Sequence, residues 1–196
     1  MAKPNILLRT KRKKALESFQ AKRYDEALAL FQNICQADRM DADARMSCGA
    51  IAGLRGDHAL AEDYCRQALA IDPKMPGAHF NLGIALRSQG KFAEACQSFK
   101  RATELKAAYS EAMDALAHAY ISLNDLPAAV QTLNEIIAIW PHKAEMHCNL
   151  GSVYQAMGRP QDAIAAYEVA LKISPRLGVA LNSLGFNISR TVGPAV

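Results

Sequence analysis

His142, His147 and Cys148 are the residues whose types and closeness in sequence most invite a chemical interpretation. Imidazoles beside a thiol could ligate a metal ion or form a Cys–His dyad. Either centre needs a larger constellation, and the sequence contains no P-loop, GxGxxG, GxSxG or HExxH motif. We therefore predict no catalytic residue, no cofactor-binding residue and no metal site, and we expect a protein that is not an enzyme.

The elements that position these residues are clearest between Ala144 and Leu177. This stretch reads as two amphipathic helices separated by a tight turn at Gly158–Arg159–Pro160. Apolar or small residues recur at helical spacing in both segments: Leu150, Gly151 and Tyr154 in the first, and Ala163, Tyr167 and Ala170 in the second. The sequence thus predicts a helical hairpin.

The same pattern recurs every 34 residues along the chain, with no insertion. One position of the second helix is always alanine: Ala27, Ala61, Ala95, Ala129 and Ala163. One position of the first helix is always small: Ala15, Gly49, Gly83, Ala117, Gly151 and Gly185. Small residues are expected where the two helices of a hairpin cross closely, because a larger side chain would hold their backbones apart. The pattern therefore predicts a stack of helical hairpins.

These motifs resemble the tetratricopeptide repeat (TPR) family, and in particular the arrays of O-GlcNAc-transferase-type proteins. The resemblance implies an all-α fold, a right-handed α-α superhelix (TPR solenoid) of five full repeats plus one half repeat. Residues 1–7 are expected to form a flexible N-terminal arm. The array is expected over residues 8–196, with repeats at 8–41, 42–75, 76–109, 110–143 and 144–177 and a partial repeat at 178–196.

Composition and charge narrow the class of protein. Residues 1 to 23 contain eight basic residues and one acid, a net charge of +7, so the rest of the chain carries −3 of the total of +4. No apolar run approaches the ~20 residues that a membrane-spanning helix needs. Five cysteines without a CxxC pair favour a reducing compartment. We expect a cytoplasmic protein without a membrane span, and nucleic acid binding through the basic arm is a disfavoured alternative.

The resemblance also implies where a ligand binds, because the first helix of each repeat lines the concave groove in this family. The triplets Asn81–Leu82–Gly83 and Asn149–Leu150–Gly151 are similar to those of O-GlcNAc-transferase-type arrays, whose asparagines bond to the backbone of an extended peptide. A carboxamide suits this role because it offers a donor and an acceptor. The predicted groove residues are Arg12, Lys13, Met46, Ser47, Phe80, Asn81, Ile84, Asp114, His118, Asn149 and Ser152.

The charge of these groove positions is graded along the chain. Basic residues crowd the first repeat, while Glu111, Asp114 and Glu145 lie in the fourth and fifth. We therefore expect an extended peptide that is basic where it meets those two repeats. The family also has a dicarboxylate clamp, which holds a C-terminal carboxylate with basic residues and asparagines at fixed repeat positions. This chain has other residue types at those positions, so binding of such chain ends is disfavoured.

The predicted function is a non-enzymatic scaffold that binds a protein or peptide partner, with no cofactor. One alternative makes the array the substrate-recruiting TPR region of a larger glycosyl- or sulfotransferase-type enzyme. The half repeat at the C-terminal end adds a second expectation. It carries Val179, Ala180 and Phe186 with little charge before Arg190, so we expect further chain, a second copy (self-association) or a partner to cover it.

Overall fold

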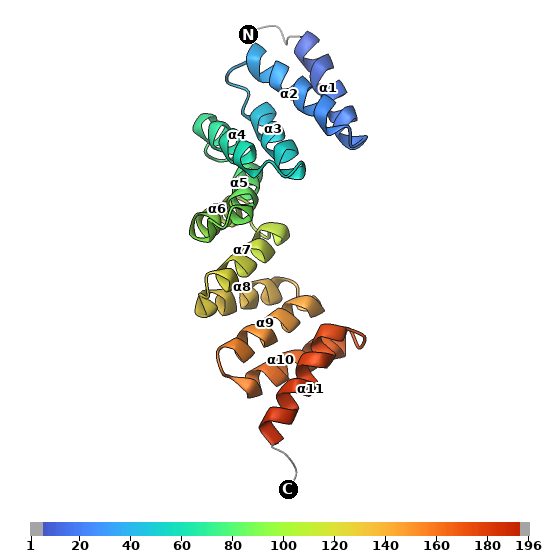
Figure 1. Cartoon of the computed structure of the whole chain (residues 1–196), viewed down its shortest axis with the longest axis vertical. Coiled ribbons are helices and arrows are strands. Elements are labelled where there is room, and N and C mark those ends of the chain that lie inside the picture. The colour runs from blue at the N-terminus through green and yellow to red at the C-terminus, as the bar shows by residue number, and fades with distance from the viewer. Residues whose placement is uncertain (1–5, 193–196) are drawn as a thin grey trace. The chain divides into compact units, whose positions relative to one another are not determined.

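The computed structural model of the protein describes residues 6–192, with side chains as far as residue 185, and this range forms eleven α-helices and no strand (Figure 1). In chain order the helices are α1 (Ile6–Gln20), α2 (Tyr24–Ala37), α3 (Ala42–Leu54), α4 (His58–Ile71), α5 (Pro76–Ser88), α6 (Phe92–Leu105), α7 (Ser110–Ser122), α8 (Leu126–Ile139), α9 (Ala144–Ala156), α10 (Pro160–Ile173) and α11 (Gly178–Val192). The all-α expectation is confirmed. None of the described helices is both long enough and apolar enough to cross a membrane.

The chain divides into two compact units, residues 1–107 and residues 108–196. Unit 1 contains α1 to α6, and unit 2 contains α7 to α11. Within each unit, consecutive helices are joined by short connections and pack against one another (Figure 1). From α3 onward, the first helices of the hairpins (α3, α5, α7, α9 and α11) begin at intervals of 34 residues.

The turn inside each hairpin uses a left-handed backbone at one repeat position. Gly56, Gly90 and Gly158 have φ values of 82°, 76° and 70° there, a conformation that glycine adopts without a Cβ penalty. Lys22 and Asn124 occupy the same position in the first and fourth hairpins, with φ values of 59° and 57°. The hairpin geometry therefore imposes this turn even where the sequence carries a side chain.

Aspartates and prolines fix where the helices begin. The side chains of Asp41, Asp57 and Asp125 each accept a hydrogen bond from the backbone N–H three residues later, at 2.8, 3.1 and 3.2 Å. This contact satisfies a donor that the first turn leaves unpaired. Pro76 and Pro160 open α5 and α10, where a missing N–H costs nothing.

Small residues bring the paired helices close, as the sequence predicts. A Cβ placed on Gly83 of α5 would lie 2.5 Å from the ring of Phe99 on α6, and one on Gly151 of α9 would lie 2.7 Å from the ring of Tyr167 on α10. Both rings are fully buried. In these two hairpins the glycine therefore sets how closely the paired helices approach.

The two ends of the described range differ in part from expectation. Helix α1 begins at Ile6, two residues before the expected start of the first repeat, and the rest of the expected arm lies outside the described residues. In α11, Ala180 is buried against α10, whereas Val179 is 62% exposed and Leu181 is 49% exposed. The side chain of Phe186, also expected on this face, lies outside the described residues.

Candidate peptide-binding groove

In unit 1 the predicted groove residues of α3 and α5 line two adjoining hollows. The smaller has a volume of about 140 Å³ and is lined by Leu16, Phe19, Phe31, Met46, Ser47, Ala50, Ile51 and Asn81. The larger, about 310 Å³, is lined by Gly49, Ala50, Gly53, Leu54, Phe80, Asn81, Ile84 and Ala85. Ala50 and Asn81 belong to both linings, so the two hollows meet there.

Asn81 is the polar side chain at this meeting point, and it is half-buried. Its carboxamide forms no hydrogen bond with any residue that the structure describes. The hydroxyl of Ser47, the other polar group of the smaller hollow, already donates to the Asp43 carbonyl at 2.8 Å. Asn81 therefore offers both a donor and an acceptor to a ligand, between two surfaces suited to apolar side chains.

The two basic residues predicted for the groove, Arg12 and Lys13, lie on α1, and each is paired with a carboxylate. The guanidinium of Arg12 pairs with the carboxylate of Asp41, which also caps α3, so this contact ties α1 to α3. Lys13 is exposed, and its Nζ lies 3.9 Å from the carboxylate of Glu17 on the same helix. Neither basic residue lines the two hollows.

In unit 2, Asp114 of α7 is paired with Lys143, which lies immediately before α9. The Lys143 Nζ lies 3.4 Å from the Asp114 carboxylate, donates to the Ser110 hydroxyl at 2.6 Å and lies 4.8 Å from the centre of the Trp140 ring. This ammonium offsets the charge that would attract a basic ligand to Asp114. The exposed Glu111, in the first turn of α7, has no such partner among the described residues.

The remaining predicted residues of unit 2 differ in how their side chains are used. Asn149 of α9 is half-buried, and its carboxamide has no hydrogen-bond partner among the described residues. The Ser152 hydroxyl lies 3.1 Å from the hydroxyl of the buried Tyr167, which donates to Gln155 at 3.2 Å. His118 is exposed on α7. Asn149 is thus available to a ligand, whereas Ser152 helps to satisfy a core tyrosine.

The predicted set includes the apolar Met46, Phe80 and Ile84, which line the hollows, but it omits four other apolar residues that lie there. Leu16 and Leu54 line the hollows and are 47% and 59% exposed, and Phe19 and Ala50 lie beside them. They occupy the later groove positions of the same 34-residue register, so the register could have identified them. The prediction favoured polar side chains, and the structure shows a mainly apolar surface in unit 1.

His147, one of the two histidines that invited a metal interpretation, contacts the backbone just before its own helix instead. His79 and His147 share one repeat position, and the Nε2 of each lies 3.0 Å from a proline carbonyl, that of Pro73 and of Pro141 respectively. Cys148 is buried. Among the described residues, no group of three or more histidine, cysteine, aspartate or glutamate side chains could hold a metal ion.

The family model described as "Cilia and flagella-associated protein 70 middle TPR-like domain" matches residues 12–173. The probable UDP-N-acetylglucosamine–peptide N-acetylglucosaminyltransferase SPINDLY of Hordeum vulgare is 26% identical over 158 residues, which is 76% of this chain and 16% of that protein. Tetratricopeptide repeat protein 6 of Homo sapiens is 29% identical over 119 residues, 61% of this chain and 23% of that protein. The chain thus spans less than a quarter of each relative.

The fold is shared with solved structures at low sequence identity. The crystal structure of YrrB, described as a TPR protein with an unusual peptide-binding site, superposes with a TM-score of 0.80 at 20% identity, over 88% of this chain and 89% of that one. This likeness confirms the TPR solenoid as the fold class. Since the family model covers most of the sequence and the helical hairpins repeat as that family requires, the chain belongs to the TPR-like family represented by the middle domain of cilia and flagella-associated protein 70.

Proposed function

We propose that the protein is a non-enzymatic scaffold that binds an extended peptide of a protein partner along its groove. The supporting observation is the carboxamide of Asn81, which is half-buried between two apolar hollows and makes no hydrogen bond with the described residues. A carboxamide in that place can pair with one peptide unit, while flanking apolar side chains of the ligand enter the hollows. YrrB, which shares the fold, is itself described as having a peptide-binding site.

The lining of the hollows also indicates which peptide would bind. Leu54 and Ile84 favour an apolar ligand side chain in the larger hollow. Arg12 is engaged by Asp41, and Leu16 provides apolar surface where a clamp for a C-terminal carboxylate would need an asparagine. The proposed ligand is therefore an internal apolar segment rather than an acidic chain end.

The cytoplasmic location of the protein stays a prediction.

The test uses a peptide selected on the purified protein from a random-peptide phage library. Its Kd is measured by fluorescence anisotropy for the native protein and for Asn81→Ala. Loss of one net hydrogen bond, about 1 kcal/mol, raises Kd about five-fold. The matched control is Asn33→Ala, which removes an exposed carboxamide on α2, outside the groove.

A second variant tests the hollows themselves. Ala50 borders both of them, so Ala50→Leu places additional side-chain volume where the ligand's apolar groups are expected. Binding should be lost or greatly weakened while the helical circular dichroism is unchanged. Equal Kd values for the native protein, Asn81→Ala and Ala50→Leu would exclude this groove as the peptide site.

The same groove could instead recruit substrates for an attached glycosyl- or sulfotransferase. The similarity to SPINDLY, which covers most of this chain and a small part of that enzyme, favours this second candidate. The sequence of the reading frame that encodes the chain tests it directly. A continuous catalytic domain in that frame would support recruitment, and its absence would leave the independent scaffold.

A further inference from the structure

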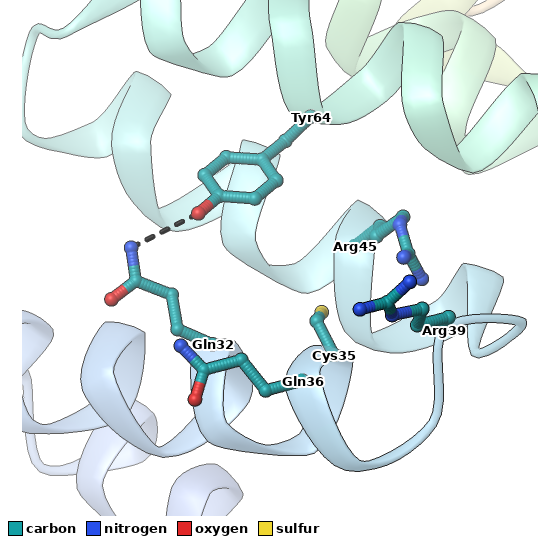
Figure 2. Close-up of a pocket in the computed structure, with 6 residues that line it drawn as sticks. All are labelled: Gln32, Cys35, Gln36, Arg39, Arg45 and Tyr64. Atoms are coloured by element: carbon teal, nitrogen blue, oxygen red, sulfur yellow. Dashed lines mark hydrogen bonds between the residues drawn. The ribbon is translucent and has the colours of Figure 1, made fainter.

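A third hollow in unit 1 lies between α2, α3 and α4 and has a volume of about 470 Å³ (Figure 2). It shares no residue with the two groove hollows. Its lining is mostly polar and consists of Gln32, Cys35, Gln36, Arg39, Arg45 and Tyr64. This second pocket is therefore chemically unlike the groove and can bind a different kind of group.

Two arginines concentrate positive charge at one side of the pocket. The guanidinium groups of Arg39 and Arg45 point toward each other in Figure 2, and neither forms a salt bridge with a described carboxylate. Arg45 Nη1 donates to the Asp41 carbonyl at 3.2 Å, which holds that side chain in place. The Asp41 carboxylate is engaged by Arg12 and by the Ala44 N–H. Two facing cations without a carboxylate between them favour an anion in that position.

Uncharged donors and acceptors complete the lining. Gln32 Nε2 donates to the Tyr64 hydroxyl at 3.0 Å, which leaves the hydroxyl hydrogen and the Gln32 carbonyl oxygen for a ligand (Figure 2). Gln36 lies one turn further along α2 and is exposed. Burial raises the pKa of Tyr64, so its hydroxyl stays a donor at neutral pH. Such groups suit the oxygens of an anion and the peptide units beside it.

We propose that this pocket binds a phosphorylated side chain of a peptide. A phosphoryl group offers three acceptor oxygens and nearly two negative charges, which match two guanidinium forks better than a single carboxylate does. Asp38 and Asp63 are exposed near the same helices. These acids would repel a polyanion such as RNA, which brings a row of phosphates, but they do not prevent entry of a single phosphorylated residue.

Cys35 provides a reporter inside the pocket. Its side chain is half-buried and lines the same pocket as Arg39 and Arg45 (Figure 2). A hydrogen bond from the Cys48 side chain, assisted by the charge of Arg45, lowers the pKa of Cys35 and favours the reactive thiolate. The same hydrogen bond, together with burial, raises the pKa of Cys48. Alkylation of Cys35 should therefore report whether an anion occupies the pocket.

The experiment compares alkylation of Cys35 in the reduced, folded protein by iodoacetate, an anion, and by neutral iodoacetamide, using peptide mass spectrometry. The ratio of the two rates, divided by the ratio for glutathione, measures anion preference at the pocket. We expect this quotient to exceed one and to fall severalfold in Arg39→Gln. Arg101→Gln, which removes an exposed arginine of α6, is the charge-matched control and should leave the quotient unchanged.

The ligand is then tested by protection of Cys35 from iodoacetamide. A short phosphoserine peptide should slow alkylation severalfold, and its unphosphorylated form should not. Protection should disappear in Arg39→Gln and persist in Arg101→Gln and Asn81→Ala, so the result is independent of the groove. Arg39 is exposed, so its substitution should not alter the fold, which circular dichroism checks.

Three outcomes would overturn the proposal. Equal protection by the unphosphorylated peptide would show that phosphate is not recognised. Stronger protection by inorganic phosphate or by a short RNA, at equal phosphate concentration, would reassign the pocket to those ligands. Protection that survives in Arg39→Gln would place the binding elsewhere on the protein.

Discussion

Replacing Gly83 by alanine tests the close helix contact on which the groove geometry of unit 1 depends. The added Cβ would lie 2.5, 2.6 and 2.9 Å from three carbons of the Phe99 ring, compared with the ~3.5–4.0 Å of an ordinary carbon contact. Phe99 is fully buried, and its ring centre lies 5.9 Å from that of Phe80. The ring must therefore move by about 1 Å, and its neighbours on α5 limit that movement.

Two effects of opposite sign determine how much Gly83→Ala changes the free energy of unfolding. Alanine favours the helix over glycine by about 1 kcal/mol, because glycine loses more backbone entropy. Overpacking of a buried site costs about 1–3 kcal/mol. We therefore expect Gly83→Ala to lower the free energy of unfolding by about 1 kcal/mol, or the Tm by about 4–8 °C for a unit of this size. Urea unfolding followed by far-UV circular dichroism measures the difference.

Two further variants separate packing from propensity. Gly53→Ala on α3 places a Cβ 3.8 Å from that of Ala61, an ordinary contact, so this variant should be as stable as the native protein or more stable. Phe99→Leu should reduce the cost of Gly83→Ala, because Ala117 and Leu133 fill the corresponding positions in the fourth hairpin. If Gly83→Ala proved as stable as Gly53→Ala, the argument from close packing would be refuted.

Three other predictions concern hydrogen bonds and charge. The hydrogen bond from Lys91, with smaller contributions from neighbouring donors, lowers the pKa of Glu62 from 4.5 to about 2. The ionised Glu62 carboxylate therefore stabilises the fold above pH 4.5, and this contribution is lost as the pH falls toward 2. In Glu62→Gln, the midpoint of urea unfolding should therefore depend less on pH between about 2 and 4.5. Tyr167→Phe should cost about 1 kcal/mol in urea unfolding, because a buried hydroxyl loses its hydrogen bonds. Lys143→Met should tighten anisotropy-measured binding of a lysine-containing groove peptide by up to about 1 kcal/mol at low salt, since Asp114 loses its cation.

Each of these three predictions has a contrary result. An acid-unfolding profile that is unchanged by Glu62→Gln would exclude this carboxylate as a source of the pH dependence. If Tyr167→Phe unfolded with the same urea midpoint as the native protein, loss of the hydroxyl's hydrogen bonds would carry no cost. For the groove, the control is the double variant Asp114→Asn with Lys143→Met; a gain in affinity that persists in it would show that Asp114 is not the group that attracts the lysine.

Local sequence rules account for most of the fold. In three hairpins the glycine of the first helix faces a residue of the second helix sixteen positions later: Gly49 faces Cys65, Gly83 faces Phe99 and Gly151 faces Tyr167. Contacts of this kind lie within one hairpin, so a repeating sequence specifies them directly. The left-handed backbone at Lys22 and Asn124 has no local sequence signal, because these two turns lack the glycine found at the same repeat position in the other hairpins.

The repeat register predicts which helix carries each candidate residue, but it does not predict whether the side chain is left unpaired for a ligand. The register placed Arg12, Asn81 and Asp114 on the groove helices. Whether each is available to a ligand depends on residues of another helix, since Arg12 pairs with Asp41 and Asp114 pairs with Lys143. Asn81 has no such partner among the described residues, and the sequence carries no signal for that difference.

The sequence by itself determined the hairpin repeat, because its contacts are local and recur at a fixed interval. The tertiary structure decided which surfaces remain for binding. The smaller hollow beside Asn81 combines side chains from four helices and the pocket of Arg39 and Arg45 from three, while the larger hollow joins α3 to α5. Their composition depends on how neighbouring hairpins pack, and a pattern within one repeat does not encode that packing.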